Sequence, residues 1–150
     1  MIELLATVVI TVSSVLLFAY WFRYTCLLIL SAKTSRDYSG EFANANKLGF
    51  QQVQSQLQEA SHPDLDLLRT TLDRDYELVR KILKYMESSE GQSALETRML
   101  AINYRLMGSW YSISRHFSPR IAVRALEEMS MVVAHFANAM GEHAHAGSAA

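Results

Sequence analysis

The chain begins with an unbroken apolar stretch and continues as segments in which apolar positions recur at helical spacing. Residues 4–22 carry no charged side chain across 19 positions. At about 1.5 Å per residue, a helix of this length spans roughly 28 Å, enough to cross the hydrocarbon core of a bilayer. No Lys or Arg precedes the stretch, and no pair of small residues marks a cleavage site after it. The pattern therefore favours an uncleaved membrane anchor over a signal peptide.

The end of the anchor is marked by one arginine inside the apolar run. Tyr20, Trp21 and Tyr24 surround Arg23, as in the aromatic belts found where helices leave a bilayer. We therefore expect the lipid boundary at this point, with Arg23 reaching the headgroups. The run then resumes over residues 26–30. This collar, with Leu28 at its centre, is predicted to rest in the interface or against a partner.

A small polar stripe lies within the anchor. Thr7, Thr11 and Ser14 are separated by steps of four and three, which places them on one side of a helix. Small hydroxyl residues in this arrangement allow close packing of transmembrane helices, so these three are predicted partner contacts. The alternative is that their hydroxyls bond to carbonyls of their own helix.

The charges that flank the anchor predict its orientation. Glu3 is the charged side chain before it, whereas Arg23, Lys33 and Arg36 follow it. Positive residues favour the cytoplasmic side. We expect a single pass through the cell (inner, cytoplasmic) membrane, with a short N-terminus outside and the C-terminal domain in the cytoplasm.

Beyond the anchor, four amphipathic segments predict helices: residues 41–60, 61–91, 93–117 and 119–141. Three of them have one predicted apolar line each: Phe50, Val53, Leu57 and Ala60; Leu65, Leu68, Leu72, Tyr76, Val79, Leu83 and Met86; and Ala122, Leu126, Met129, Val133, Phe136 and Met140. Short connections between amphipathic helices are typical of antiparallel bundles. The predicted fold is therefore all-α, with one N-terminal transmembrane helix followed by a small antiparallel bundle of three to four helices. The expected divisions are an anchor with juxtamembrane helix at 1–33, a linker at 34–41, the bundle at 42–141 and a disordered tail at 142–150.

The segment 93–117 differs from the others because it has two apolar stripes. The longer stripe, which includes Trp110, is assigned to the core of the bundle. Its members are Leu95, Met99, Ile102, Leu106, Trp110, Ile113 and Phe117. The second consists of Leu100, Tyr104, Met107 and Tyr111. Tyr and Met are enriched at interfaces, so these four are predicted to contact a partner or another copy. Burial of both stripes inside the domain is the alternative.

Charge and composition narrow the possible partners. The net charge of -1 gives no reason to expect nucleic-acid binding. Positive charge nevertheless gathers locally, because five arginines and one acid lie between Glu96 and Arg124. Arg98 and Arg105 are seven residues apart on one helix face. We interpret them as charged contacts for an acidic partner or anionic headgroups, with an ordinary solvated face as the alternative.

No catalytic motif and no strong metal motif is found in the sequence. It contains no phosphate-binding loop and no Gly-x-Ser-x-Gly or His-Glu-x-x-His pattern, so an enzyme is not predicted and no cofactor is expected. The sequence instead predicts an interaction protein that binds subunits of a membrane complex, itself, or both. The alternative is a metal- or haem-binding bundle that uses His116 or His135.

Overall fold

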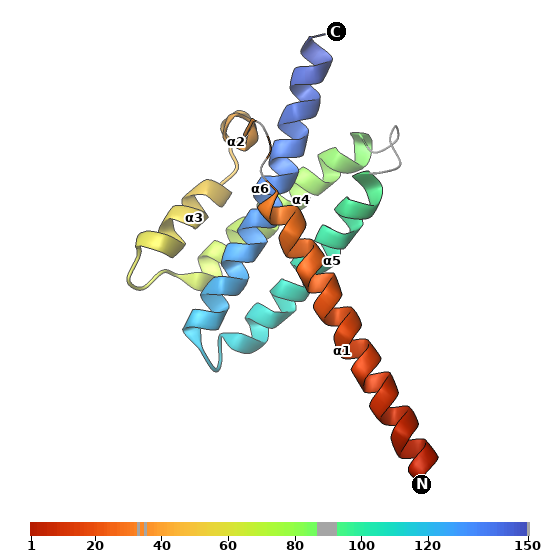
Figure 1. Ribbon diagram of the computed structural model, residues 1–150. Helices are drawn as coiled ribbons and strands as arrows, with labels where there is room; N and C mark the ends of the chain where they lie inside the picture. Colours follow the sequence, from red (N-terminus) through yellow and green to blue (C-terminus); the bar gives the residue numbers. More distant parts are fainter. Residues whose placement is uncertain (33, 35, 87–92, 150) are drawn as a thin grey trace. The chain divides into compact units, whose positions relative to one another are not determined.

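The computed structural model describes residues 1–32, 34, 36–86 and 93–149, and these residues form six helices and no strand. The all-helical prediction is confirmed: one long apolar helix is followed by a helical bundle. The chain divides into two compact units, Met1–Lys33 and Thr34–Ala150. Figure 1 shows the six helices in chain order.

The first unit is a single helix, α1 (Ile2–Ser31). It is long and apolar enough to cross a membrane. The helix continues without a break past Arg23 to the end of the second apolar run, so the predicted collar is helical. The rings of Tyr20 and Tyr24 stack one turn apart, with centroids separated by 6.4 Å.

The second unit is built around its last helix, α6 (Pro119–Ser148). This helix packs against α2 (Ser39–Asn46), α3 (Phe50–Glu59), α4 (Leu65–Met86) and α5 (Ser93–Ser114). In Figure 1, α6 passes through the middle of the bundle, with α2 and α3 to its left and α5 to its right. Its buried positions include the whole apolar line predicted for this segment: Ala122, Leu126, Met129, Val133, Phe136 and Met140.

The predicted apolar lines of α3 and α4 are confirmed as core in most positions. Phe50, Val53 and Leu57 are buried on α3, whereas Ala60 is exposed just after it. On α4 the buried members are Leu68, Leu72, Tyr76, Val79 and Leu83. The predicted continuation at Met86 lies outside the described side chains. Burying these large side chains against α6 provides the main driving force for folding.

The predicted helix at 41–60 is wrong because the structure divides this segment into α2 and α3. Lys47 adopts a left-handed conformation (φ 53°, ψ 44°) and ends α2. The backbone N–H of Gly49 then donates to the buried carboxylate of Asp75 on α4, at 2.7 Å. Burial raises the pKa of Asp75, although the N–H groups of Gly49 and Phe50 oppose that shift. Asp75 thus supplies from another helix the capping oxygen that the start of α3 requires.

The predicted linker and tail are both shorter than expected. The predicted linker extends over 34–41, but α2 already begins at Ser39. The tail at 142–150 was predicted to be disordered, but α6 continues to Ser148. Gly141 does not end α6. It lies where the helix passes close to Tyr38, since a Cβ atom built on Gly141 would be 2.4 Å from the Tyr38 Cβ atom.

Candidate interaction surface on helix α5

Helix α5 lies beside α4 across a layer of long side chains. Among the described residues, no Cα atom of α4 is within 8 Å of a Cα atom of α5. The space is bridged by two tyrosines of α5 that reach acidic residues of α4. The Tyr104 hydroxyl donates to Asp73 Oδ1 at 2.8 Å, and the Tyr111 hydroxyl donates to Asp66 Oδ1 at 3.0 Å.

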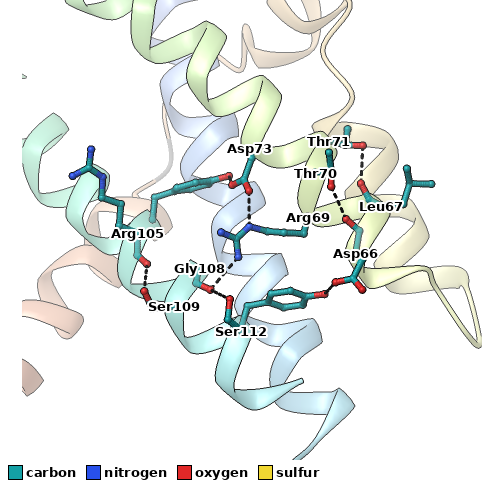
Figure 2. Close-up of polar contacts among 12 residues, drawn as sticks. Asp66, Leu67, Arg69, Thr70, Thr71, Asp73, Arg105, Gly108, Ser109 and Ser112 are labelled. Carbon is teal, nitrogen blue, oxygen red and sulfur yellow. Dashed lines mark hydrogen bonds and ion pairs between the residues drawn. The ribbon is translucent and has the colours of Figure 1, made fainter. Parts of the chain in front are cut away.

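An arginine of α4 completes this layer. The Nε atom of Arg69 donates to Asp73 at 2.9 Å, and its Nη1 atom donates to the Gly108 carbonyl at 3.0 Å. Figure 2 shows the Arg69 side chain reaching across to α5 between the two acids. A Cβ atom on Gly108 would be 2.7 Å from Arg69 Nη2. A residue without a side chain therefore makes room for the guanidinium group.

The tyrosines are held as neutral hydrogen-bond donors. Burial raises the pKa of Tyr104, and the hydrogen bond to Asp73 raises it further. Burial also raises the pKa of Tyr111, and its hydrogen bond to Asp66 raises that pKa further. The Tyr104 ring stacks on the Tyr76 ring of α4, with centroids 3.8 Å apart. Together these contacts fix the rotation of α5 about its own axis.

This rotation places the predicted partner-contact stripe inside the bundle. Leu100, Tyr104, Met107 and Tyr111 are only 0–7% exposed. Their prediction as a surface for a partner is therefore corrected, because the interior of the bundle already covers them. The alternative, burial of both stripes, holds for this stripe but not for the other one.

The stripe assigned to the core is instead on the outside. One of its seven members, Met99, is partly buried. The other six are between 46% and 83% exposed: Leu95, Ile102, Leu106, Trp110, Ile113 and, in the turn after α5, Phe117. We call these six residues the outer stripe. On α5 its members fall within an arc of about 80°, at 100° per residue. The two apolar faces of α5 are thus reversed relative to the sequence-based assignment.

The two borders of the outer stripe differ in their environment. On one border, Asn103 donates to Glu128 of α6 at 2.7 Å and Glu96 lies 2.9 Å from His135 of α6. The other border carries the exposed side chains of Arg98 and Arg105, which lie about 40–60° from Ile102 around the helix. The prediction that these arginines share one face therefore fits their positions on α5.

The predicted contacts on α1 lie on a single continuous helix. The hydroxyls of Thr7 and Thr11 donate to the carbonyls of Glu3 and Thr7, each at 2.8 Å. This is the alternative considered for that stripe, and it leaves packing of Ser14 and its neighbours against another helix as a prediction. Leu28 and the residues of the aromatic belt, Tyr20, Trp21, Arg23 and Tyr24, also lie within α1.

The two histidines considered as alternative metal or haem ligands have separate surroundings among the described residues. His135 interacts with Glu96, as described above, whereas His116 is exposed in the turn after α5. Across residues 1–32, 34, 36–86 and 93–149, no three His, Cys, Asp or Glu side chains gather in a way that would hold a metal ion.

The hydrogen bonds that orient α5 are indicated in the sequence by the spacing of polar residues on α4 and α5. The apolar pattern of α5 does not indicate them. Asp66 and Asp73 are seven residues apart on α4, and Tyr104 and Tyr111 are seven apart on α5. In antiparallel helices the first acid meets the second tyrosine, and the second acid meets the first. Matching polar spacing on neighbouring segments would therefore have identified the inner face.

No protein-family model matches the chain, and no curated protein or solved structure is significantly similar to it. The role of α5 is therefore inferred from its own geometry.

Proposed function

We propose that this protein is a single-pass, membrane-anchored helical interaction protein that serves as an accessory or scaffold subunit of a membrane protein complex. The observation that supports this is the outer stripe of α5, with five large apolar side chains exposed along one helix and Phe117 beyond it. Contiguous apolar surface of this kind on a folded domain marks an interaction site. The core of the bundle does not need the stripe, because the other face of α5 is already buried.

The anchor is assigned to α1, which has the length and composition of a membrane span. Its apolar side chains, including Leu5, Val9 and Leu16, are largely exposed, which suits contact with lipid or with another transmembrane helix. The positive charges that follow α1 support a cytoplasmic bundle in a cell membrane. We propose that the bundle presents the outer stripe to partners held close to the same membrane.

The test is whether the native assembly depends on the outer stripe. The tagged full chain is extracted from its native membranes with a mild detergent and separated by native electrophoresis. The wild-type chain is expected to migrate in a species much larger than a detergent-bound monomer. Leu106→Glu and Ile113→Glu should each release it as a monomer, because a carboxylate cannot be buried in an apolar interface without a large desolvation cost.

The matched control replaces an exposed leucine elsewhere. Leu67 on α4 is 61% exposed, and Leu67→Glu should leave the large species intact. Circular dichroism melts check that all three variants keep the wild-type fold. A wild-type chain that is monomeric after mild extraction, or an assembly that survives both α5 substitutions, would contradict the proposed function.

A further inference from the structure

The outer stripe is bordered by positive charge on the side that α6 leaves open. Residues 97–126 contain five arginines and no acidic residue. Arg98 and Arg105 are exposed along the stripe itself. Of these five arginines, Arg115 is the one that forms an ion pair among the described residues: it binds Asp66 at 2.7 Å. A partner that covers the stripe therefore meets a cationic edge.

The shape of the stripe fits another helix. Its members recur with steps of three, four and seven residues from Leu95 to Phe117, the spacing of a coiled-coil seam. The arc of about 80° is narrower than the broad apolar face of an amphipathic helix that lies in a lipid interface. On α5 the seam extends from Leu95 to Ile113, about two and a half heptads or roughly 27 Å, which is enough for knobs-into-holes packing with one neighbouring helix.

A second copy of α5 fits this seam poorly because of the same charges. In an antiparallel pair, equivalent borders face each other, so the border of Arg98 and Arg105 would meet its own copy. In a parallel pair, the arginine border would face the opposite border of the second copy. On that border Asn103 is buried against Glu128 of α6, and Glu96, although its side chain is 45% exposed, is already paired with His135 of α6.

We propose that the outer stripe of α5 binds an apolar helix with an acidic border, contributed by a different protein. Leucine or isoleucine side chains of that helix occupy the seam, and its glutamate or aspartate side chains face Arg98 and Arg105. This inference rests on the proposed function, since it names the partner chemistry of the same surface. Opposite charges beside an apolar seam fix both the choice and the direction of the partner.

The test uses the full chain in nanodiscs of zwitterionic phosphatidylcholine and two synthetic 22-residue peptides. Both peptides carry leucine and isoleucine at the seam positions. One has glutamate at the bordering positions, and the other has lysine there. Fluorescence anisotropy of labelled peptide is expected to show binding of the acidic peptide at least about tenfold tighter than binding of the basic peptide.

Charge reversal provides the decisive comparison. The double variant Arg98→Glu, Arg105→Glu should lose the acidic peptide and gain the basic one. The control reverses Arg74 and Lys81, which are also seven residues apart and exposed but belong to α4. Arg74→Glu, Lys81→Glu should leave the peptide preference unchanged. Melting curves that match the wild type show that neither double variant acts through loss of the fold.

Several results would overturn the inference. Equal binding of the two peptides, no binding of the acidic peptide, or a preference that the α5 reversal does not change would each do so. Pairing of nanodiscs without peptide would identify a second copy as the occupant. If peptide binding is lost when one lipid in four is anionic phosphatidylglycerol, the occupant of the outer stripe is the membrane surface and not a partner helix. If the native assembly depends on Leu106 and Ile113 but tolerates the α5 charge reversal, this inference fails and the proposed function stands.

Discussion

Two glycines of α6 show how the surroundings decide what a small residue does. Gly141 lies against Tyr38, where an added Cβ atom would be 2.4 Å from the Tyr38 Cβ atom and 3.1 Å from its carbonyl oxygen. Gly147 is six residues further along the same helix and has no neighbour within 4 Å of an added Cβ atom. The sequence alone suggested a helix end at the first glycine, because glycine is common after the last turn.

We predict opposite effects for alanine at these two positions. Gly141→Ala should lower the free energy of unfolding by about 1–3 kcal/mol, because backbone atoms of Tyr38 cannot move aside easily. Gly147→Ala should leave it unchanged or raise it by up to about 1 kcal/mol, since alanine favours a helix. Urea denaturation followed by circular dichroism measures both. A neutral Gly141→Ala variant would contradict the close approach of α6 to Tyr38.

The stacked pair Tyr76 and Tyr104 offers a second contrast at the level of single residues. The Tyr104 hydroxyl donates to Asp73, whereas the buried Tyr76 hydroxyl has no hydrogen-bond partner among the described residues. A buried polar group without a partner costs stability, and replacing it with an apolar group of similar shape can be neutral or favourable.

We therefore predict that Tyr76→Phe leaves stability unchanged or raises it, by up to about 1 kcal/mol. Tyr104→Phe should lower it by about 1 kcal/mol, because a hydrogen bond to a partly exposed carboxylate is lost. Thermal and urea unfolding of the two variants give the comparison. Equal losses for both would show that the Tyr76 hydroxyl has a partner that the described contacts do not include.

At the scale of elements, α5 shows the limit of hydrophobic periodicity. The lines of α3, α4 and α6 are confirmed in most positions, because each of these segments has one dominant apolar face. On α5 there are two apolar faces, and periodicity favours the longer one as core although the structure buries the shorter one. The choice is made by specific contacts, namely Tyr104 with Asp73, Tyr111 with Asp66 and Arg69 with the Gly108 carbonyl.

The break between α2 and α3 also depends on a contact distant in sequence. The predicted apolar line of residues 41–60 begins only at Phe50, just after Gly49, but the sequence contains no proline there. The start of α3 is instead held by Asp75, which lies 26 residues after Gly49. A tertiary hydrogen bond of this kind leaves no local signal, so the sequence could predict helical content but not this division.

The reversed faces of α5 predict two different responses to truncation. Leu100→Ala should lower the free energy of unfolding by about 2–4 kcal/mol, because Leu100 is fully buried. Ile113→Ala, on the outer stripe and 53% exposed, should change it by less than about 1 kcal/mol. Urea denaturation of the full chain in detergent tests both. A larger loss at Ile113 than at Leu100 would restore the original assignment of the two faces.

At the scale of the whole molecule, the sequence predicted the two units better than the details within them. The boundary after residue 33 agrees with the division of the chain into Met1–Lys33 and Thr34–Ala150. The uncharged stretch of 19 residues distinguishes the first unit in the sequence, and it gives α1 the length and composition of a membrane span. The orientation of α1 depends on three flanking charges and stays a prediction.

We predict that the C-terminus faces the cytoplasm. A reporter that is active only in the cytoplasm, fused after the last residue, should be active, and one that is active only outside should not. Replacing Arg23 and Arg36 with glutamine in the same fusions should reduce this preference, since positive charges favour the cytoplasmic side. Activity of the external reporter in the wild-type fusion would reverse the proposed topology.

The outer stripe of α5 also has a consequence for how the sequence can change over time. Because Leu106 and its neighbours are not needed for the core, folding alone would let selection replace them with polar residues. Only a binding partner would preserve them. In any set of related chains, the outer stripe should therefore remain apolar, and Arg98 and Arg105 positive, while other exposed positions such as Leu67 and Tyr85 drift freely.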